Sequence, residues 1–457
     1  MKRNRLLFAA LPMLLACGPM FAQDVFELHG YMRAGVGRSS NGGEMASFYL
    51  PGTVGNPSGG PGYRLGNEED NYLELAMDVR AYEKGSTNFK LHFRPTFRQY
   101  NDARDASTDA GGNVDSSHSA TQNQMVYLRE AWGEVNGVLG NSDILKEATL
   151  WAGRRFYQRH DSHMLDFYYW NNSGDGVGIE NVNVGLGKLS YAYIQADRNN
   201  VDGGWGTGNF PGKVQTDVYN YNGKVVVGSH DLRWSGLSPW EGASFNLGFQ
   251  YNEPSRRKGT DTLAYNNIGR RFHIEYQQSN ILGGDNKLYI TKGDGSTFWN
   301  WYNPEVNTHN NWWMVMDNLY IQPMKQLGLG VVVVHRVQNE DDRQPGHRDM
   351  TWNSIGARPV WFFTQHISLA AEVGYDQFKV TGDGSAADGQ TRGMLKKTLA
   401  LQFSPQSSWW SRPVLRLFVT RANWNKYATA WGTPSALGVF NGYQAGTTFG
   451  AQIEAWW

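Results

Sequence analysis

The sequence predicts an all-β protein, a single antiparallel barrel that crosses a membrane with its strands. The composition is rich in turn and strand formers, with 54 glycines and 14% aromatic residues among 457. Proline, glycine, asparagine and aspartate recur about every dozen positions, which is typical of many strands joined by turns. Long helical periodicity is absent, and no linker or change of composition divides residues 23–457. We therefore expect one domain over that range.

The first 22 residues form a predicted export signal. Lys2, Arg3 and Arg5 precede an apolar run from Leu6 to Cys17, and small residues lead to a cleavage site near Ala22. An alternative is a lipoprotein signal, because Leu14 to Cys17 resembles a lipoprotein cleavage box. Cys17 is the single cysteine of the chain, so the exported protein can form no intramolecular disulfide.

Charge and hydropathy exclude two further classes of protein. Lysine plus arginine equals aspartate plus glutamate at 42 each, so there is no basic surface for a nucleic-acid partner. After residue 17 no apolar stretch approaches the roughly 18 to 20 residues that a transmembrane helix needs.

Strict alternation of apolar and charged residues predicts the strands. The first run places Phe26, Leu28 and Met32 on one face, and Glu27, His29, Tyr31 and Arg33 on the other. The same pattern recurs, over about nine to eleven residues each time, at 72–80, 89–98, 367–376 and 449–456. Each of these strands has one apolar face and one strongly charged face.

Two architectures accommodate such strands. A soluble sandwich would bury the apolar face, whereas a membrane barrel would turn it to lipid and the charged face to an aqueous lumen. The strands have the spanning length, the charged faces are dense, and aromatic residues gather at strand ends, as in outer-membrane barrels. The chain also ends on a strand that finishes with Trp456 and Trp457. These observations favour the barrel.

The segment from Trp151 to Trp170 is the most informative part of the sequence. It mixes aromatic rings with three arginines, two histidines and two aspartates. Burying that many ionisable groups without partners would cost several kcal/mol each, so the segment should face water in a passage or cleft. Aromatic faces beside charged hydrogen-bonding groups suit the apolar faces and hydroxyl rim of a carbohydrate. The segment therefore predicts a sugar ligand.

The same segment contains weaker candidates for a metal site or an enzyme. His160, His163 and Asp166 are close enough in sequence to suggest metal ligands, and Asp161 with Asp166 could form a hydrolytic carboxylate pair. The neighbouring arginines would repel a cation, and Lys188 is followed by leucine rather than the serine or threonine of a phosphate loop. We assign no catalytic residue, no metal and no cofactor.

Strand parity indicates which side chains line the lumen. It places one set on the inner face of the predicted strands: Tyr31, Arg33, Tyr72, Glu74, Trp410, Arg416 and Trp456. Ordinary filling of the barrel would explain a single tyrosine there. Four rings gathered with arginines and carboxylates instead favour a path for sugar.

Several blocks of the sequence resemble the maltoporin family of maltodextrin-specific outer-membrane channels. They are spread from the start of the mature chain to its end, at residues 29–33, 63–68, 151–170, 178–190, 410–413 and 450–457. The resemblance implies a homotrimer of 18-stranded barrels in the outer membrane of a Gram-negative bacterium. Each barrel would be narrowed by a constriction loop around Arg159 to Trp170. Maltose and maltodextrins would diffuse through it without an energy source.

The resemblance also implies roles for residues at matching positions. The aromatic slide would comprise Tyr31, Tyr72, Trp410 and Trp456, with Tyr168 as the constriction ring. The polar track beside it would comprise Arg33, Arg64, Glu74, Arg129, Arg159, Asp161, His163 and Asp166. Three alternatives remain: a porin selective for another oligosaccharide such as sucrose, a barrel enzyme acting on glycan, and a purely structural barrel.

The chain departs from the family pattern at three places. Glu69 stands where a disulfide cysteine is common, and Gln99 to Ala103 contains no tryptophan to reach into a neighbouring subunit. A further phenylalanine of the slide falls near Leu288 or Tyr289. These departures concern sugar entry and the preferred chain length.

Overall fold

The computed structural model describes the barrel and part of its loops. The described residues are 25–43, 45–50, 62–68, 70–100, 124–197, 225–256, 268–295, 297, 309–340, 348–382, 384, 387–429, 440 and 442–457. The predicted export signal, residues 1–22, lies outside them. None of the described segments is a helix long and apolar enough to cross a membrane.

Within these residues, eighteen strands form one antiparallel sheet. The first half comprises β1 (Phe26–Ser39), β2 (Asp70–Lys84), β3 (Thr87–Tyr100), β4 (Gln124–Asn136), β5 (Thr149–Arg155), β8 (Gly174–Asn183), β9 (Lys188–Asp197), β10 (Val225–Leu237) and β11 (Ala243–Arg256). The second comprises β12 (Gly269–Ile281), β13 (Gly284–Gly295), β14 (Asn311–Met324), β15 (Leu327–Asn339), β16 (Asp349–Phe362), β17 (Ile367–Thr381), β18 (Thr391–Phe403), β19 (Val414–Trp424) and β20 (Ala445–Trp456).

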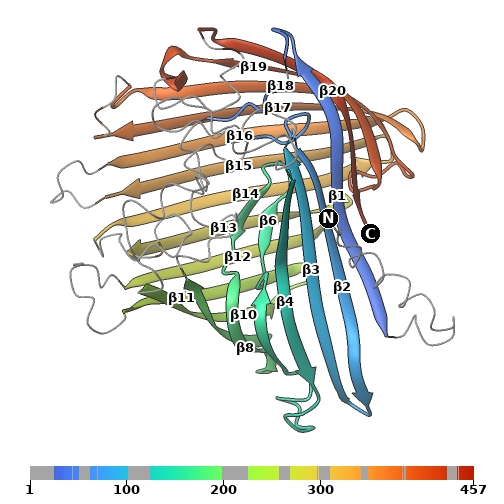
Figure 1. The fold of residues 1–457 in the computed structure, drawn as a ribbon, viewed down its shortest axis with the longest axis vertical. Helices are drawn as coiled ribbons and strands as arrows, with labels where there is room; N and C mark the ends of the chain where they lie inside the picture. Colours follow the sequence, from blue (N-terminus) through green and yellow to red (C-terminus); the bar gives the residue numbers. More distant parts are fainter. Residues whose placement is uncertain are drawn as a thin grey trace, which may run out of the picture.

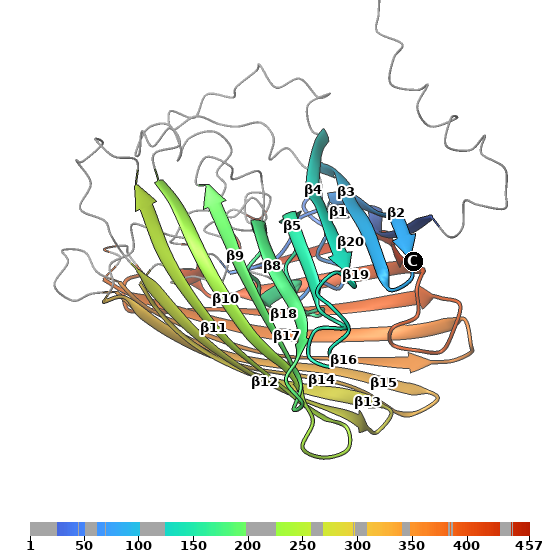
Figure 2. The same cartoon turned by 90° about the horizontal axis from the view of Figure 1, so that it is seen from below.

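The sheet closes on itself where the first strand meets the last. β1 pairs with β2 on one side and with β20 on the other, so these strands lie side by side in Figure 1. The peptide groups of Gly30 and Trp457 exchange hydrogen bonds of 3.1 and 3.2 Å at this junction. Closure pairs the edges that an open sheet would expose, as lipid requires. The strands curve into a continuous wall in Figure 2. The predicted barrel is therefore confirmed.

The two faces of the wall alternate as the sequence predicts. On β17, Leu369 and Val373 point outward, whereas Ser368 and Glu372 are buried on the inner side. The predicted lengths are too short, because the five strands that the alternation marked, β1, β2, β3, β17 and β20, have 12 to 15 residues. Alternation reveals the stretch that faces lipid, and hydrogen bonding extends several strands beyond it.

Two further segments lie inside the ring. One contains a small hairpin of β6 (His160–Ser162) and β7 (Phe167–Trp170), which β5 and β8 flank in sequence (Figure 1). The other is residues 62–68, just before β2. Glycines on the inner wall admit it: Gly356 and Gly374 are paired across β16 and β17, and a Cβ on either would meet the Tyr63 ring within about 2 Å.

Candidate functional site

The hairpin is held inward by hydrogen bonds to distant strands. His160 Nδ1 lies 2.8 Å from a carboxylate oxygen of Glu275 on β12, and the Tyr169 hydroxyl donates to the same oxygen at 2.6 Å. The Ser162 hydroxyl donates to the Asn318 side chain on β14 at 2.6 Å. Since β12 and β14 lie well away from β5 and β8 in the strand order, the hairpin reaches across the lumen. The predicted inward loop at Arg159 to Trp170 is confirmed.

The segment 62–68 meets this hairpin inside the barrel. The Arg64 amide donates to the Met164 carbonyl at 3.0 Å. On its other side, Lys396 and Thr420 donate to the carbonyls of Leu65 and Gly66, both at 2.9 Å. The two segments together therefore carry charged side chains from the wall into the lumen.

One group of charged residues, which includes Arg64 of the predicted polar track, surrounds the buried carboxylate of Glu454. Arg64 lies 3.0 Å from it, and Arg412 and Arg416 each lie 2.8 Å from it. The Tyr31 hydroxyl donates to the same carboxylate at 3.2 Å and accepts from Arg64 at 2.6 Å. Charge-assisted hydrogen bonds of this kind compensate the cost of removing Glu454 from water.

A second group surrounds Arg33 on β1. Its guanidinium makes two hydrogen bonds to Asp70, of 2.7 and 2.9 Å, and lies 3.1 Å from Glu68. A carboxylate oxygen of Asp166 lies 3.8 Å from Arg33, which connects the wall to the hairpin. Arg98 binds Asp70 from β3 at 2.7 Å.

Glu74 and Arg129, two further residues of the predicted polar track, lie on β2 and β4. Tyr72 donates a short hydrogen bond to Glu74, and Arg94 lies 3.0 Å from that carboxylate. Arg129 is buried on β4 and acts electrostatically on Tyr72. These residues continue the line of charges from Arg33 toward β4.

The two histidines of the hairpin have different surroundings. His163 lies 3.0 Å from Arg64 and 3.2 Å from Arg412, one at each ring nitrogen. Burial, followed by the charge of Arg64, holds the pKa of His163 well below its usual value, so the ring is neutral. His160 instead faces Glu275. Two guanidiniums beside His163 disfavour a metal cation there.

The hairpin also presents a carboxylate to the lumen at Asp161. Its pKa is raised, first by the surrounding protein and second by the negative charge of Asp166. Arg159 places its guanidinium 3.5 Å from the Phe156 ring centre and 4.1 Å from that of Tyr168. Burial raises the pKa of Tyr168 to about 12, so its hydroxyl stays protonated. Charge and ring are thus adjacent on the hairpin.

The four predicted slide rings form two neighbouring pairs. Tyr31 and Tyr72 have ring centres 6.0 Å apart, and Trp410 and Trp456 have ring centres 6.5 Å apart. Tyr31 and Trp456 are direct register partners on β1 and β20, so the two pairs are adjacent. The structure therefore brings all four rings together beside the charged groups.

The predicted strand position of Trp410 is wrong. It lies in the turn 404–413 between β18 and β19, not on the inner face of a strand. The turn carries Trp409 into the barrel, where it packs over Gly328 and Gly330 of β15. Side chains in a turn do not alternate between two faces, so strand alternation cannot predict where Trp410 points. Its position depends on the conformation of the turn.

Two further rings of the same cluster, Trp409 and Tyr320, were not among the predicted site residues. Trp410 lies 4.7 Å from Trp409 and 4.9 Å from Tyr320 between ring centres. Tyr320 follows the inner parity of β14, so alternation offered a signal for it, whereas nothing in sequence distinguished Trp409. Alternation also places Glu454 on the inner face of β20. Arg412 lies in the block 410–413, one of those that resemble the maltoporin family.

Tyr289 differs from the slide position suggested for this region. It points inward but is fully buried, with its ring centre 4.6 Å from that of Tyr169. The hairpin therefore covers Tyr289, while Leu288 has the opposite parity. Neither residue joins the group of Tyr31, Tyr72, Trp410 and Trp456.

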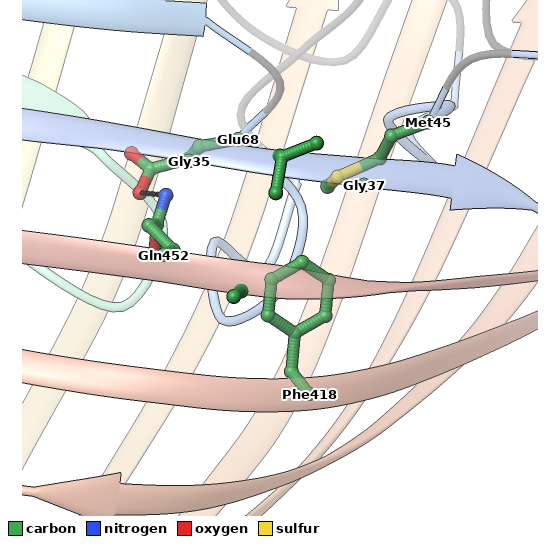
Figure 3. A pocket seen from close by; sticks show the side chains of 8 residues that line it. Gly35, Gly37, Met45, Glu68, Phe418 and Gln452 are labelled. Carbon is green, nitrogen blue, oxygen red and sulfur yellow. Dashed lines mark hydrogen bonds between the residues drawn. The ribbon is translucent and has the colours of Figure 1, made fainter.

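A small pocket in the wall lies beside the track (Figure 3). It is lined by Gly35, Val36, Gly37, Met45, Glu68, Phe418, Ala451 and Gln452. The Gln452 amide donates to Glu68 at 3.4 Å, and both residues are seen on one side of the pocket. A Cβ at Gly37 would come within 2.7 Å of the Met45 sulfur. Glycine at position 37 thus leaves room for Met45, in residues 45–50, to lie close to the wall.

Among solved structures, the chain is similar to an outer membrane protein, to a BenF-like porin and to OccAB2. Acinetobacter baumannii OccAB2 has 11% identity and a TM-score of 0.49, with 95% of this chain and 98% of that chain covered. Pseudomonas aeruginosa OpdK has 8% identity and a TM-score of 0.48, with 95% and 100% covered. A BenF-like porin from Pseudomonas fluorescens has 8% identity and a TM-score of 0.48, with 94% and 98% covered.

A comparison with protein families identifies the chain more directly. The family described as LamB porin matches residues 26–457, which is nearly the whole chain and every strand of the barrel. The predicted resemblance and the outer-membrane location are confirmed by this match. The chain therefore belongs to the LamB porin family, the maltoporin family, and forms a porin channel in the outer membrane.

Proposed function

We propose that this porin conducts maltose and maltodextrins by energy-independent diffusion along an aromatic slide and a polar track. The observation that carries the proposal is the line of Tyr72, Tyr31, Trp456 and Trp410 beside a contiguous set of paired charges. Linear α-glucans present apolar faces and a hydroxyl rim along their whole length. A continuous row of rings and charges matches that repeat.

Weak contacts in series suit transport better than one tight site. Conduction requires attraction strong enough to recruit sugar and weak enough to release it. Each ring contributes about 1 kcal/mol of stacking, on the scale of aromatic pairs. A sugar that leaves one ring is already in contact with the next, so no step loses the whole binding energy.

The polar track contributes hydrogen bonds without requiring a conformational change. Arg33 binds three carboxylates, from Glu68, Asp70 and Asp166. On the hairpin, Asp161 is exposed and Arg159 and Asp166 are half-buried. A guanidinium has five N–H donors and a carboxylate accepts several hydrogen bonds, so hydroxyls can bind at the unused positions of these groups. The sugar therefore exchanges water for protein partners along the path.

Assembly and processing complete the proposal. Residues 1–22 act as the export signal, residues 23–457 form the mature barrel domain, and three chains associate into a homotrimer in outer-membrane lipid. Sequencing the N-terminus of the purified protein should start at Gln23. A first residue at Cys17 would instead indicate the lipoprotein alternative.

Conductance measurements test the substrate. In a planar bilayer, maltodextrins at millimolar concentration should block the ion current of the purified protein reversibly. Sucrose and a β-linked oligosaccharide of the same length serve as comparisons. Current that maltodextrins leave unchanged, or that either comparison sugar blocks better, would contradict the assignment. Release of products from a labelled maltodextrin would favour the enzyme alternative.

A further inference from the structure

Three side chains of types that can bind metal, those of Glu27, His29 and Asp78, lie together on the inner face of the barrel. Glu27 and His29 are two residues apart on β1, so they share the inner face. Asp78 on β2 is the direct register partner of Glu27. β1 begins at Phe26, so the cluster lies near one mouth of the barrel, at the end where short turns join the strands.

The ligand atoms of these three residues converge. One atom from each lies within 4.8 Å of the others, and His29 Nε2 is 3.7 Å from Glu27 Oε2. The side chains of Glu27 and His29 are 50% and 56% exposed, so an ion can reach them from water. Small rotamer changes would shorten these separations to the roughly 3 to 3.5 Å found between ligands at metal bonds near 2.1 Å.

Asp78 is held in place by a neighbour on β3. His92 Nδ1 lies 2.7 Å from Asp78 Oδ1, and the His92 ring stacks on Trp132 with ring centres 3.8 Å apart. Glu134 lies 3.9 Å from the other nitrogen of His92. Outer partners of this kind orient metal-binding carboxylates. Asp78 therefore has a defined orientation toward Glu27 and His29.

The local charge favours a cation. Glu27 and Asp78 are directly opposite each other on neighbouring strands, an arrangement of like charges that destabilises a sheet. Of the nearby basic side chains, Arg80 is paired with Glu83 at 2.8 Å, His92 contacts Asp78 at 2.7 Å and Lys90 acts on Asp78 electrostatically, and none of these contacts includes Glu27. A divalent ion between the two carboxylates would offset their repulsion.

We propose that Glu27, His29 and Asp78 bind a divalent transition-metal ion at this mouth of the channel. One imidazole nitrogen and two carboxylate oxygens are ligands that Zn²⁺ accepts, with water completing the coordination. His92 acts as a positioning residue through Asp78. The site shares no residue with the proposed aromatic slide and does not depend on the sugar that the channel carries.

Isothermal titration of the purified full-length protein with Zn²⁺, after removal of metal by a chelator and without sugar, tests the site. We expect one Zn²⁺ per chain. His29→Ala should weaken binding at least tenfold, and His92→Ala should weaken it about tenfold through loss of orientation. Glu27→Gln removes one ligand with little change of shape and replaces His29→Ala if that variant does not fold.

A matched control is His230→Ala. His230 lies on the outer face of β10, with one carboxylate, Glu253, at 3.4 Å. Its substitution should leave Zn²⁺ binding unchanged. No binding by the unaltered protein up to millimolar Zn²⁺, or equal binding by the Glu27→Gln variant, would overturn the proposal. Neither outcome affects block by maltodextrins, which is measured without metal.

Discussion

Glu454 shows how a charged residue is accommodated in the wall of the lumen. Its carboxylate is fully buried, and three arginines from β19, the preceding turn and segment 62–68 surround it. An unpaired buried carboxylate would cost several kcal/mol, so the cluster is stable only as a unit.

Trp456 is the residue at which the two ring pairs meet, and its removal should interrupt the slide. Trp456→Ala loses about 1 kcal/mol of stacking, so the maltodextrin concentration for half block should rise about fivefold. Titration of the bilayer current measures this change. Trp240→Ala, at an exposed ring in the turn before β11, is the control. Equal half-block concentrations for both variants would remove Trp456 from the path.

Asp161 should give the channel a pH-dependent ion selectivity. Its pKa is raised by the surrounding protein and by Asp166. It is therefore protonated at a higher pH than an ordinary aspartate, whose pKa is about 4. As the pH falls through that raised value, the lumen loses a negative charge and the ratio of cation to anion permeability should fall.

Reversal potentials in a salt gradient, measured at several pH values, test this. Asp161→Asn should remove the step that lies above the ordinary aspartate range. Asp143→Asn is a suitable control, because Asp143 is exposed in a turn and Lys146 lowers its pKa. A pH profile of Asp161→Asn identical to that of the unaltered protein would assign the titration to another group.

At the scale of elements, the hairpin β6–β7 acts as a rigid insert. The single carboxylate of Glu275 accepts three hydrogen bonds, from His160, Tyr169 and Asn246. The Trp170 ring lies against Gly248 on β11, where a Cβ would approach it within 2.4 Å. These anchors lie on separate strands and hold the hairpin in one position. A ring that the hairpin presents to the lumen can therefore set the width of the bore.

Tyr168 is the ring of the hairpin that should narrow the channel. Tyr168→Ala should widen the bore and raise single-channel conductance, while block by maltodextrin weakens about fivefold through loss of one stacking contact. Single-channel recording measures both effects. Tyr375→Ala, on the outer face of β17, should change neither. Unchanged conductance in Tyr168→Ala would exclude it from the constriction.

At the scale of the whole molecule, the barrel separates two solvents. Outward residues such as Val373, Leu399 and Leu417 are exposed on the wall, whereas inward neighbours such as Glu372 and Arg416 are buried and paired. Closure between β1 and β20 lets every strand of the sheet have two neighbours. One alternating pattern therefore provides an apolar surface for the lipid outside and a polar surface for the water inside.

A charge on the outer face should destabilise this arrangement. Val373→Arg, in the middle of β17, should lower the free energy of unfolding by about 2 to 4 kcal/mol in lipid vesicles. Denaturant titration followed by tryptophan fluorescence measures the change. Ile144→Arg, at an exposed apolar residue in the turn between β4 and β5, should have little effect. Equal destabilisation by both substitutions would contradict a lipid-facing position for Val373.

Strand alternation alone predicted the inner position of Tyr31, Arg33, Tyr72, Glu74 and Trp456, and the structure confirms each. It could do so because successive side chains of a strand point to opposite faces. The partners of those residues could not be predicted. Arg64 reaches Glu454 from 390 positions away in the sequence, and that contact depends on barrel closure and on the inward path of residues 62–68.

The fold class, the outward and inward faces and the presence of a charged aromatic segment are local properties, so they can be derived from the order of residues. The turn that carries Trp410, the burial of Tyr289 beneath the hairpin, and the convergence of Glu27, His29 and Asp78 are different. They depend on which strands become neighbours and where inner segments pack. Long-range packing free energy sets those choices, and no short-range pattern encodes it.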